Sequence, residues 1–320
     1  MDSKKIKLRV VFMGTSDLSE TILGTLVENE YNVVGVFTKP DMKVGRKQEI
    51  EESLVKKMAK EKNIPVFQPL KFNSDAVEEL KKLKPDLIIV AAYGKIIPKS
   101  ALEIPGFGCI NVHVSLLPKY RGPSPIQNAL LSGEKETGVT IMFMDEGVDT
   151  GDIIVQEKTI IEPEDTTATL MQKMSVVGSQ LLLKTIPLLI EGKIEKTPQD
   201  NTQATLCQLI ERSDGKIFWT DSAENIYNRY RALTPWPGIF TFWKNGSEVI
   251  RLKLNSIGLQ KINPIEKHQT GEVFELGSDI GVQTENGIII LKELQLEGKK
   301  VTDAKSFING YPNFIGSILQ

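Results

Sequence analysis

The sequence of 320 residues has 39 Lys and Arg against 41 Asp and Glu, which gives a formal net charge of −2 at pH 7. Its hydrophobic share of 40% and charged share of 25% are those of an ordinary globular protein, and its length suits two domains. No run reaches the roughly 18 apolar residues of a membrane span, and the near-neutral charge disfavours nucleic-acid binding by bulk electrostatics.

Short apolar runs alternate with helical patterns in the first half of the chain. The apolar runs predict strands at 8–13, 33–37, 66–67, 87–92, 110–114 and 139–144. The helical patterns predict helices at 18–28, 57–62, 75–83, 125–132 and 166–190. Ser16 or Asp17 is expected to cap the first of these helices, and Ser74 the third. Such alternation indicates βαβ units, so we predict an α/β fold: a mostly parallel sheet with helices on both faces, which binds its ligand at the carboxyl ends of the strands.

A polar, turn-rich segment at 193–205 separates this region from the rest of the chain. It contains Pro198, Asp200 and Asn201, and we interpret it as a linker. The predicted domains on either side are 1–192 and 206–320. In the second domain a helix at 223–232 precedes short strands at 239–243, 249–256, 271–275, 281–284 and 288–296. Short, evenly spaced strands predict a small, closed or partly closed β-barrel.

One strand of the first domain has an unusual polar pattern. Asn111, His113 and Ser115 alternate along it, so their side chains are expected on one face near the strand end. A buried strand of a parallel sheet is normally apolar on both faces, and unused polar groups are costly there. The pattern favours a functional site only slightly over a hydrogen-bonded core histidine. The other histidine, His268, lies in a polar loop and is predicted to be a surface residue.

An acidic turn follows the strand at 139–144. It contains Asp145, Asp149 and Asp152 together with Gly147 and Gly151, which suit a backbone that runs close to a ligand. A carboxylate delivered by this turn could orient or deprotonate a histidine at a neighbouring strand end. The alternatives are a solvated turn and a metal site. The metal site is disfavoured because no matching His or Cys cluster accompanies the acids.

Other classes of site lack their motifs. The chain has no G-x-G-x-x-G and no P-loop, so nicotinamide and nucleoside triphosphate binding have little support. It has no G-x-S-x-G elbow, and neither Cys109 nor Cys207 has a convincing base beside it, so covalent catalysis is disfavoured. The two cysteines give neither a disulfide framework nor zinc spacing, and no secretory segment is recognised, which favours a cytoplasmic location. The turn at 92–98 could border a flat ring ligand, or be only a tight turn.

Three segments together resemble the signature of the formyltransferases that use 10-formyltetrahydrofolate. They are Asn111-Val-His113, Ser115-Leu-Leu-Pro-Lys-Tyr-Arg-Gly122 and Asp149-Thr-Gly-Asp152. Further segments at 11–17, 92–98, 125–127 and 231–238 are similar to the members of this family that act on methionyl-tRNA. The matches follow the family order and extend over both predicted domains.

The resemblance implies a fold, a reaction and a set of site residues. The fold is a Rossmann-like catalytic domain followed by an OB-like barrel that helps to bind tRNA. The reaction is direct attack of the α-amino group of initiator methionyl-tRNA on the formyl group of 10-formyltetrahydrofolate, which gives formylmethionyl-tRNA for translation initiation. It passes through a tetrahedral intermediate and needs no metal. The expected folate-binding residues are Ser115, Leu116, Leu117, Pro118, Ala92, Tyr93, Gly94 and Asp145.

By the same resemblance, the catalytic residues are Asn111, His113 and Asp149. Asn111 and His113 would donate hydrogen bonds to the oxyanion of the intermediate. Asp149 would hold His113 in its useful protonation state and accept a proton, directly or through water. We expect the enzyme to act as a monomer with no membrane partner.

Two groups of basic residues are candidates for tRNA contacts. The family inserts a basic loop after the second strand, and there Lys43, Arg46 and Lys47 are expected to contact phosphates or bases. The alternative is a solvated mobile loop, because the segment continues with acids at 49–52 where the family is more basic. The second domain has equal numbers of basic and acidic residues, so a tRNA surface there requires segregated charge. Lys299 and Lys300 are predicted to belong to it on the ground of their clustering, as are Arg251 and Lys253 nearby.

The main alternative is a formyltransferase that acts on an amino sugar nucleotide. Such an enzyme shares the Asn, His and Asp residues and the Ser-Leu-Leu-Pro turn. Glycinamide ribonucleotide formyltransferase is less favoured because it normally lacks the second domain. A non-catalytic folate- or nucleotide-binding protein is disfavoured by the presence of Asn111, His113 and Asp149 together.

Overall fold

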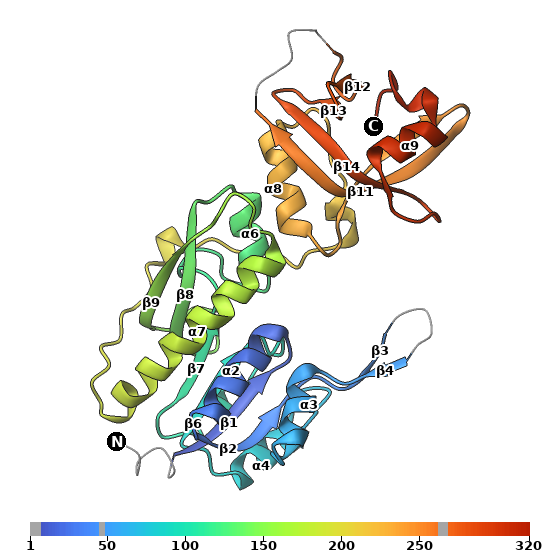
Figure 1. The fold of residues 1–320 in the computed structure, drawn as a ribbon. Coiled ribbons are helices and arrows are strands. Elements are labelled where there is room, and N and C mark those ends of the chain that lie inside the picture. The colour runs from blue at the N-terminus through green and yellow to red at the C-terminus, as the bar shows by residue number, and fades with distance from the viewer. Residues whose placement is uncertain (1–7, 45–48, 262–267) are drawn as a thin grey trace. The chain divides into compact units, whose positions relative to one another are not determined.

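The computed structural model of the chain describes residues 8–44, 49–261 and 268–320, which form two compact units (Figure 1). The first unit comprises the chain up to Pro125, Glu136–Ile161 and Thr169–Gln208. The second comprises Ile126–Lys135, Glu162–Ala168 and Leu209–Gln320. Two short segments of the predicted first domain therefore group with the second unit. The division at 193–205 into two functional domains remains a prediction.

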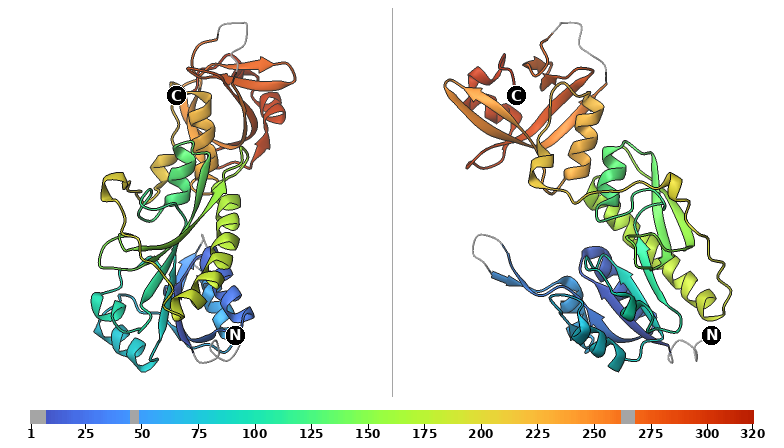
Figure 2. Two further views of the ribbon diagram at one scale, coloured as in Figure 1. Left: turned by 90° about the vertical axis from the view of Figure 1, so that its left-hand side faces the viewer. Right: turned by 180° about the vertical axis from the view of Figure 1, so that it is seen from behind.

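A seven-stranded sheet organises the first unit, in the order β5-β2-β1-β6-β7-β8-β9 (Figure 2). Its strands are β1 (Arg9–Gly14), β2 (Asn32–Phe37), β5 (Val66–Phe67), β6 (Leu87–Ala91), β7 (Cys109–His113), β8 (Glu136–Phe143) and β9 (Ile153–Ile160). The pairs from β5 to β7 are parallel, whereas β7–β8 and β8–β9 are antiparallel. The predicted mostly parallel sheet is confirmed. Strand β9 was not predicted from the sequence, because this edge strand is only half-buried and lacks a continuous apolar run.

Helices connect these strands. Those that cover the sheet within the first unit are α2 (Asp17–Glu28), α3 (Leu54–Glu61), α4 (Ser74–Lys82), α5 (Lys99–Leu102) and α7 (Thr167–Ile190). Helix α6 (Pro125–Leu131) belongs to the second unit from Ile126 onward. The cap predicted for α4 was wrong by one residue: Asn73 is the N-cap, and its side chain accepts a hydrogen bond from the backbone N–H of Ala76 at 3.2 Å. The predicted cap of α2 holds, because Ser16 is its N-cap and Ser19 Oγ accepts from the Ser16 backbone N–H at 3.1 Å.

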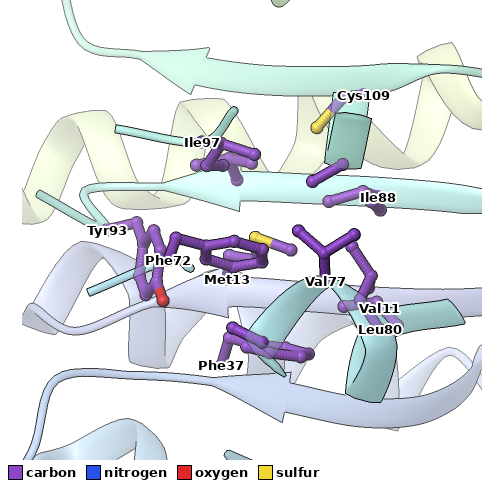
Figure 3. Close-up of a cluster of buried hydrophobic side chains, with 13 residues drawn as sticks. Val11, Met13, Phe37, Phe72, Val77, Leu80, Ile88, Tyr93, Ile97 and Cys109 are labelled. Atoms are coloured by element: carbon purple, nitrogen blue, oxygen red, sulfur yellow. The ribbon is translucent and has the colours of Figure 1, made fainter. Parts of the chain in front are cut away.

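Helices α4 and α5 pack on one face of the sheet through an apolar cluster (Figure 3). Phe37 stacks on Phe67 with ring centroids 4.8 Å apart, and Phe72 meets the edge of Tyr93 at 6.3 Å. Each large side chain buried in this way stabilises the fold by about 1.5–3 kcal/mol. Cys109 of β7 belongs to the same cluster. Because side chains alternate along a strand, every second residue of β7 after Cys109 points to this face.

Helix α7 lies on the opposite face of β7 and β8. A Cβ placed on Gly178 of α7 would lie 3.0 Å from the side chain of Val112 and 3.5 Å from that of Val139, so the helix backbone comes close to the sheet there. Among the described residues, α7 is the one helix long and apolar enough to cross a membrane by length and composition alone. Half of its most apolar window is buried in the fold, as in the core helix of a globular protein.

An antiparallel sheet that closes on itself forms the second unit. Its strands are β10 (Ile239–Asn245), β11 (Glu248–Gln260), β12 (Val273–Leu276), β13 (Asp279–Gln283), β14 (Ile288–Leu296) and β15 (Thr302–Asp303), in the order β10-β11-β14-β13-β12, with β15 beside β14. The chain end joins the two edges: Gln320 exchanges backbone hydrogen bonds with Phe242 of β10 at 2.9 and 3.0 Å, and Ser317 accepts one from Val273 of β12. This arrangement confirms the predicted OB-like barrel.

Trp243 fills the centre of this unit with no exposed surface. Its ring meets the edges of Phe307, Tyr311 and Phe314 at 5.9, 5.5 and 5.1 Å. The remaining helices of the described chain are α8 (Ala223–Leu233), α9 (Ala304–Gly310) and the 3₁₀ helices Asn201–Gln203, Arg212–Gly215 and Pro312–Phe314.

The surface position predicted for His268 was wrong in part: its ring is mostly buried, stacks on Phe274 at 3.8 Å and pairs with Glu272 at 3.1 Å.

Candidate active site

The polar residues of β7 lie at the carboxyl end of the sheet, where the parallel part meets the antiparallel part. β7 pairs with β6 on one side and with β8 on the other, and Asn111 lies opposite Met142 while His113 lies opposite Thr140. Asn111 is 9% exposed and His113 is 6% exposed. Both residues share the strand parity of Cys109, so their side chains emerge on the face covered by α4 and α5.

The structure brings Asn111 and His113 together with Asp149 of the acidic turn. Asn111 Nδ2 donates to Asp149 Oδ1 at 3.3 Å, and His113 Nδ1 lies 3.6 Å from Asp149 Oδ2. The backbone N–H of Gly122 donates to the same Oδ2 at 2.8 Å. An amide, an imidazole and a carboxylate thus form one cluster from segments separated by more than 30 residues.

The hydrogen bonds of His113 determine which ring nitrogen carries a proton. Its Nε2 lies 3.0 Å from the backbone carbonyl oxygen of Tyr120. A carbonyl oxygen only accepts, so Nε2 must be the protonated nitrogen of the neutral ring. Nδ1 is then the position at which the ring gains or loses its second proton, and it is the nitrogen that faces Asp149. The ring can therefore exchange a proton only on the side of the cluster.

The turn that carries Asp149 is held in a demanding conformation. Asp149 has φ +53°, in the left-handed region that is costly for a residue with a Cβ. A Cβ on Gly151 would lie 1.9 Å from the backbone oxygen of Phe143, so only glycine fits at that position. Asp145 Oδ1 accepts hydrogen bonds from Gly147 N at 3.0 Å and from Thr150 Oγ1 at 2.7 Å. One oxygen of Asp145 thus shapes the turn itself.

Hydrogen bonds from buried polar side chains hold the Ser115–Pro118 turn in place. Ser115 is fully buried, and its Oγ donates to the carbonyl of Lys119 at 2.7 Å. Thr140 Oγ1 donates to the carbonyl of Ser115 at 2.6 Å and accepts from the N–H of Leu117 at 3.1 Å. Gln156 Nε2 donates to Thr140 Oγ1 and to the Leu117 carbonyl, both at 2.8 Å. Of the four residues predicted to bind folate here, Ser115 and Leu117 are buried, whereas Leu116 and Pro118 are partly exposed.

Thr140 and Gln156 were not among the residues predicted from the sequence. A signal for Thr140 was present, because it is a polar residue in the otherwise apolar run at 139–144. No comparable signal marked Gln156, which lies on the unpredicted strand β9.

In the Ala92–Gly94 turn the two outer residues are exposed, whereas the side chain of Tyr93 between them is buried. Ala92 and Gly94 are exposed and have φ +45° and +68°. Tyr93 is 2% exposed, and its ring lies in the apolar cluster of Figure 3. Burial raises the pKa of its hydroxyl above the ordinary value, so this group stays protonated. The predicted contact with a flat ring is therefore open only to the backbone of this turn.

The predicted basic loop is described only at its base. Lys43 lies on β3 (Met42–Val44), which pairs with β4 (Glu49–Glu51), but its side chain lies outside the described residues, as do Arg46 and Lys47. The acid that follows the hairpin is neutralised locally: Glu52 hydrogen-bonds to Lys60 and lies 3.1 Å from Lys56. These bonds lower the pKa of Glu52, and the bond with Lys60 has the largest effect.

The basic residues predicted in the second unit differ in their surroundings. Lys299 and Lys300 are exposed and lie in the turn between β14 and β15. The guanidinium of Arg251 is 3.6 Å from the centre of the Phe240 ring, a cation–π contact. A Cβ on Gly238 would lie 2.5 Å from the side chain of Lys253, so this lysine packs over the Gly238 backbone.

These features define a class of protein. Two family models match the chain: one described as formyl transferase over residues 7–186, and one described as formyl transferase, C-terminal domain, over residues 209–312. The chain therefore belongs to the formyl transferase family.

Relatives with a more specific name resemble it along nearly the full length. The methionyl-tRNA formyltransferase of Caldicellulosiruptor saccharolyticus is 46% identical over 315 residues, which cover 97% of this chain and 99% of the relative. That of Carboxydothermus hydrogenoformans is 42% identical over 316 residues, 98% of this chain and 100% of the relative. Among solved structures, an N-formyltransferase from Helicobacter canadensis, in complex with folinic acid and dTDP-3-aminofucose, aligns with a TM-score of 0.66 over 89% of this chain and 98% of its own. At 23% identity, this last likeness is one of fold.

Proposed function

We propose that this formyltransferase transfers the formyl group of 10-formyltetrahydrofolate to the α-amino group of initiator methionyl-tRNA. The observation that carries the proposal is the cluster of Asn111, His113 and Asp149 at the end of β7, in a chain similar over nearly its whole length to enzymes named for this reaction. An amine that attacks a formyl carbon needs a donor for the developing oxyanion and an acceptor for its own proton. The cluster contains groups of both kinds.

Asn111 is the proposed oxyanion donor. One hydrogen of its amide points to Asp149 Oδ1 at 3.3 Å, which fixes the amide orientation and leaves the second hydrogen for the substrate oxygen. Because Asn111 is 9% exposed, its hydrogen bond acts in a site with little competing water. Removal of one such donor typically costs about 10²–10³-fold in rate.

His113 and Asp149 are the proposed proton carriers. Nε2 of His113 is committed to the Tyr120 carbonyl, so a second proton on the ring resides at Nδ1, between the carboxylate of Asp149 and the reacting groups. An imidazolium in this position donates to the oxyanion while Asp149 balances its charge. Asp149 then accepts the proton that the attacking amine releases, directly or through water, and this same proton passes to the tetrahydrofolate nitrogen as it leaves.

The folate co-substrate supplies the formyl group, and the residues around the cluster are suitable for it. The exposed left-handed backbone of Ala92 and Gly94 can approach a flat ring closely, because neither residue carries a large side chain there. Leu116 and Pro118 offer partly exposed apolar surface on the turn that Thr140 holds. Asp145 retains one carboxylate oxygen that is not engaged by Gly147 and Thr150 and can accept from a ring N–H.

The proposal extends to partners and location. We assign initiator tRNA binding to the loop with Lys43, Arg46 and Lys47 and to Lys299 and Lys300, with residues 206–320 as the tRNA-binding domain. A few placed cations suffice for this purpose, so the net charge of −2 is compatible with it. The enzyme is proposed to act as a cytoplasmic monomer without metal and without a membrane partner.

A competition between acceptors tests the proposal. Purified enzyme is incubated with 10-formyltetrahydrofolate and methionyl-tRNA, with a dTDP-amino sugar and glycinamide ribonucleotide as competing acceptors, and each formylated product is quantified. Formylation of methionyl-tRNA in preference to both competitors is expected. Preferential formylation of the sugar nucleotide would show that it, and not methionyl-tRNA, is the acceptor. If none of the three acceptors is formylated, the catalytic role proposed for the cluster is contradicted.

A further inference from the structure

The segment that the sequence suggests is only a linker forms part of the wall of the site. Thr197 exchanges backbone hydrogen bonds with Ile153 at 2.8 and 2.9 Å. Further along, Thr205 donates to the carbonyl of Pro118 at 3.3 Å and accepts from the N–H of Arg121 at 2.9 Å. The segment is therefore paired at one end with the start of β9 and at the other with the 118–121 turn. The start of β9 follows the acidic turn directly along the chain, and the 118–121 turn follows β7.

Gln199, within this segment, clamps the turn that carries Asp149. Its Nε2 donates to the backbone carbonyl of Asp149 at 2.9 Å and to that of Gly151 at 2.7 Å. These two carbonyls flank the bend at Thr150, so a single side-chain amide fixes both sides of it. The carboxylate of Asp149 is held separately, by the backbone N–H of Gly122.

Arg121 determines which way round the Gln199 amide lies. Nε and Nη2 of Arg121 donate to Gln199 Oε1 at 3.0 and 2.8 Å, and Nη2 also donates to Asn201 Oδ1 at 2.8 Å. A guanidinium only donates, so the amide oxygen must face it and the NH₂ group must face the two carbonyls. Arg121 is 6% exposed, which makes this orientation strongly preferred over one solvated by water.

This clamp opposes a real conformational cost. The left-handed backbone of Asp149, with φ +53°, is less favourable than an ordinary φ for a residue with a Cβ. Without the two bonds from Gln199, the turn can relax toward an ordinary φ, which moves the carboxylate away from Asn111 and His113. Misplacement of a catalytic group by about 1 Å can cost about 10²-fold in rate.

We propose that Gln199 and Arg121 are positioning residues that hold Asp149 in its productive place, and this inference rests on the role proposed for Asp149. Neither residue reaches the reacting atoms through any contact described above. Gln199 acts on the backbone of the acidic turn, and Arg121 acts on Gln199. The predicted linker is thus a part of the catalytic apparatus.

The test measures single-turnover formyl transfer to methionyl-tRNA in Gln199→Leu, Asp149→Ala and the double variant. Leucine has nearly the shape of glutamine but cannot donate to the two carbonyls. Gln199→Leu is expected to lower the rate constant by about 10²-fold, with unchanged dissociation constants for tRNA and folate. In the Asp149→Ala background, the same substitution is expected to cost nothing further, because the residue it positions is already gone.

Gln203→Leu is the matched control. Gln203 lies in the same segment and donates to Asp200 at 2.8 Å, away from the cluster. This variant is expected to keep the wild-type rate, and the heat-unfolding midpoints of all variants are compared. Arg121→Lys gives a second arm: it keeps the charge but loses the planar fork that orients Gln199, so its rate is expected to fall as well.

The outcomes separate this inference from the proposed function. A wild-type rate in Asp149→Ala would overturn the role of Asp149 itself. A slow Asp149→Ala with a wild-type Gln199→Leu would overturn the positioning role alone. An additional loss in the double variant would also overturn it, since Gln199 would then act by another route. A wild-type rate in Arg121→Lys would remove Arg121 from the pair.

Discussion

Replacement of Thr140 by valine removes one hydroxyl from beneath the proposed folate turn without a change of shape. Thr140 is fully buried, and its Oγ1 donates to the Ser115 carbonyl and accepts from Leu117 N–H and Gln156 Nε2. The variant leaves the Ser115 carbonyl and the Leu117 N–H without this partner. Gln156 is exposed and can turn to water, so it adds little. Each stranded buried group costs about 1–3 kcal/mol, so the two together should make local opening of the turn easier by about 2–6 kcal/mol.

Native-state hydrogen exchange at the Leu117 amide measures this effect directly. A loss of about 2–6 kcal/mol corresponds to roughly 30–20,000-fold faster exchange, at one decade for each 1.4 kcal/mol. Because the turn is proposed to border the folate, the KM for 10-formyltetrahydrofolate should rise at the same time. Thr140→Ser is the matched control, since it keeps the hydroxyl, and it should exchange almost as the wild type does. Unchanged exchange at Leu117 in Thr140→Val would refute the reasoning.

Three further predictions concern the catalytic cluster, the tRNA surface and the hairpin base. His113→Ala should fold normally and lose about 10²–10⁴-fold in single-turnover rate; a near wild-type rate would contradict the role of His113. Charge reversal at both Lys299 and Lys300 should weaken tRNA binding and flatten its dependence on salt, measured by filter binding from low to moderate ionic strength; unchanged binding would remove both from the surface. The pKa of Asp41 is lowered mainly by the hydrogen bond from Lys56 at 2.5 Å and, after it, by the hydrogen bond from Gln68. Because this pKa is lowered, the interaction of Asp41 with Lys56 stabilises the fold at pH values above the ordinary carboxyl pKa. This stabilisation is lost as the pH falls through the lowered pKa. Lys56→Met should therefore raise the pKa of Asp41 in an NMR titration, and an unchanged value would show that the ion pair is not formed.

The alternation of residues along β7 was enough to predict that Asn111 and His113 lie on one face of this strand, where both contact Asp149. Side chains two positions apart share a face of a strand, so Asn111 and His113 had to emerge together from an otherwise apolar segment. The acidic turn after β8 was predictable for a similar reason, since glycines and acids at a strand end indicate a backbone shaped for a ligand. Local rules of periodicity also predicted most strands and helices to within a few residues. The family signature then gave these positions their expected roles.

Contacts between distant segments were beyond such rules. Nothing in a polar run such as 193–205 shows that Gln199 reaches the carbonyls of Asp149 and Gly151, because that contact depends on how β9 and the 118–121 turn bring the segment back to the site. Tyr93 stands in a motif expected to meet folate, yet tertiary packing directs its ring into the core.

Length, charge and the periodicity of the chain predicted two domains, an α/β sheet and a barrel, and the structure confirms the sheet and the barrel. Only the tertiary structure decided that residues at the chain end close the barrel between β10 and β12, and that the predicted linker pairs with Ile153 of β9 and with the 118–121 turn. The physical reason is the separation along the chain between the segments that interact. Periodicity reports which face of an element is buried, whereas hydrogen bonds between segments 50 or more residues apart depend on the position of every element between them.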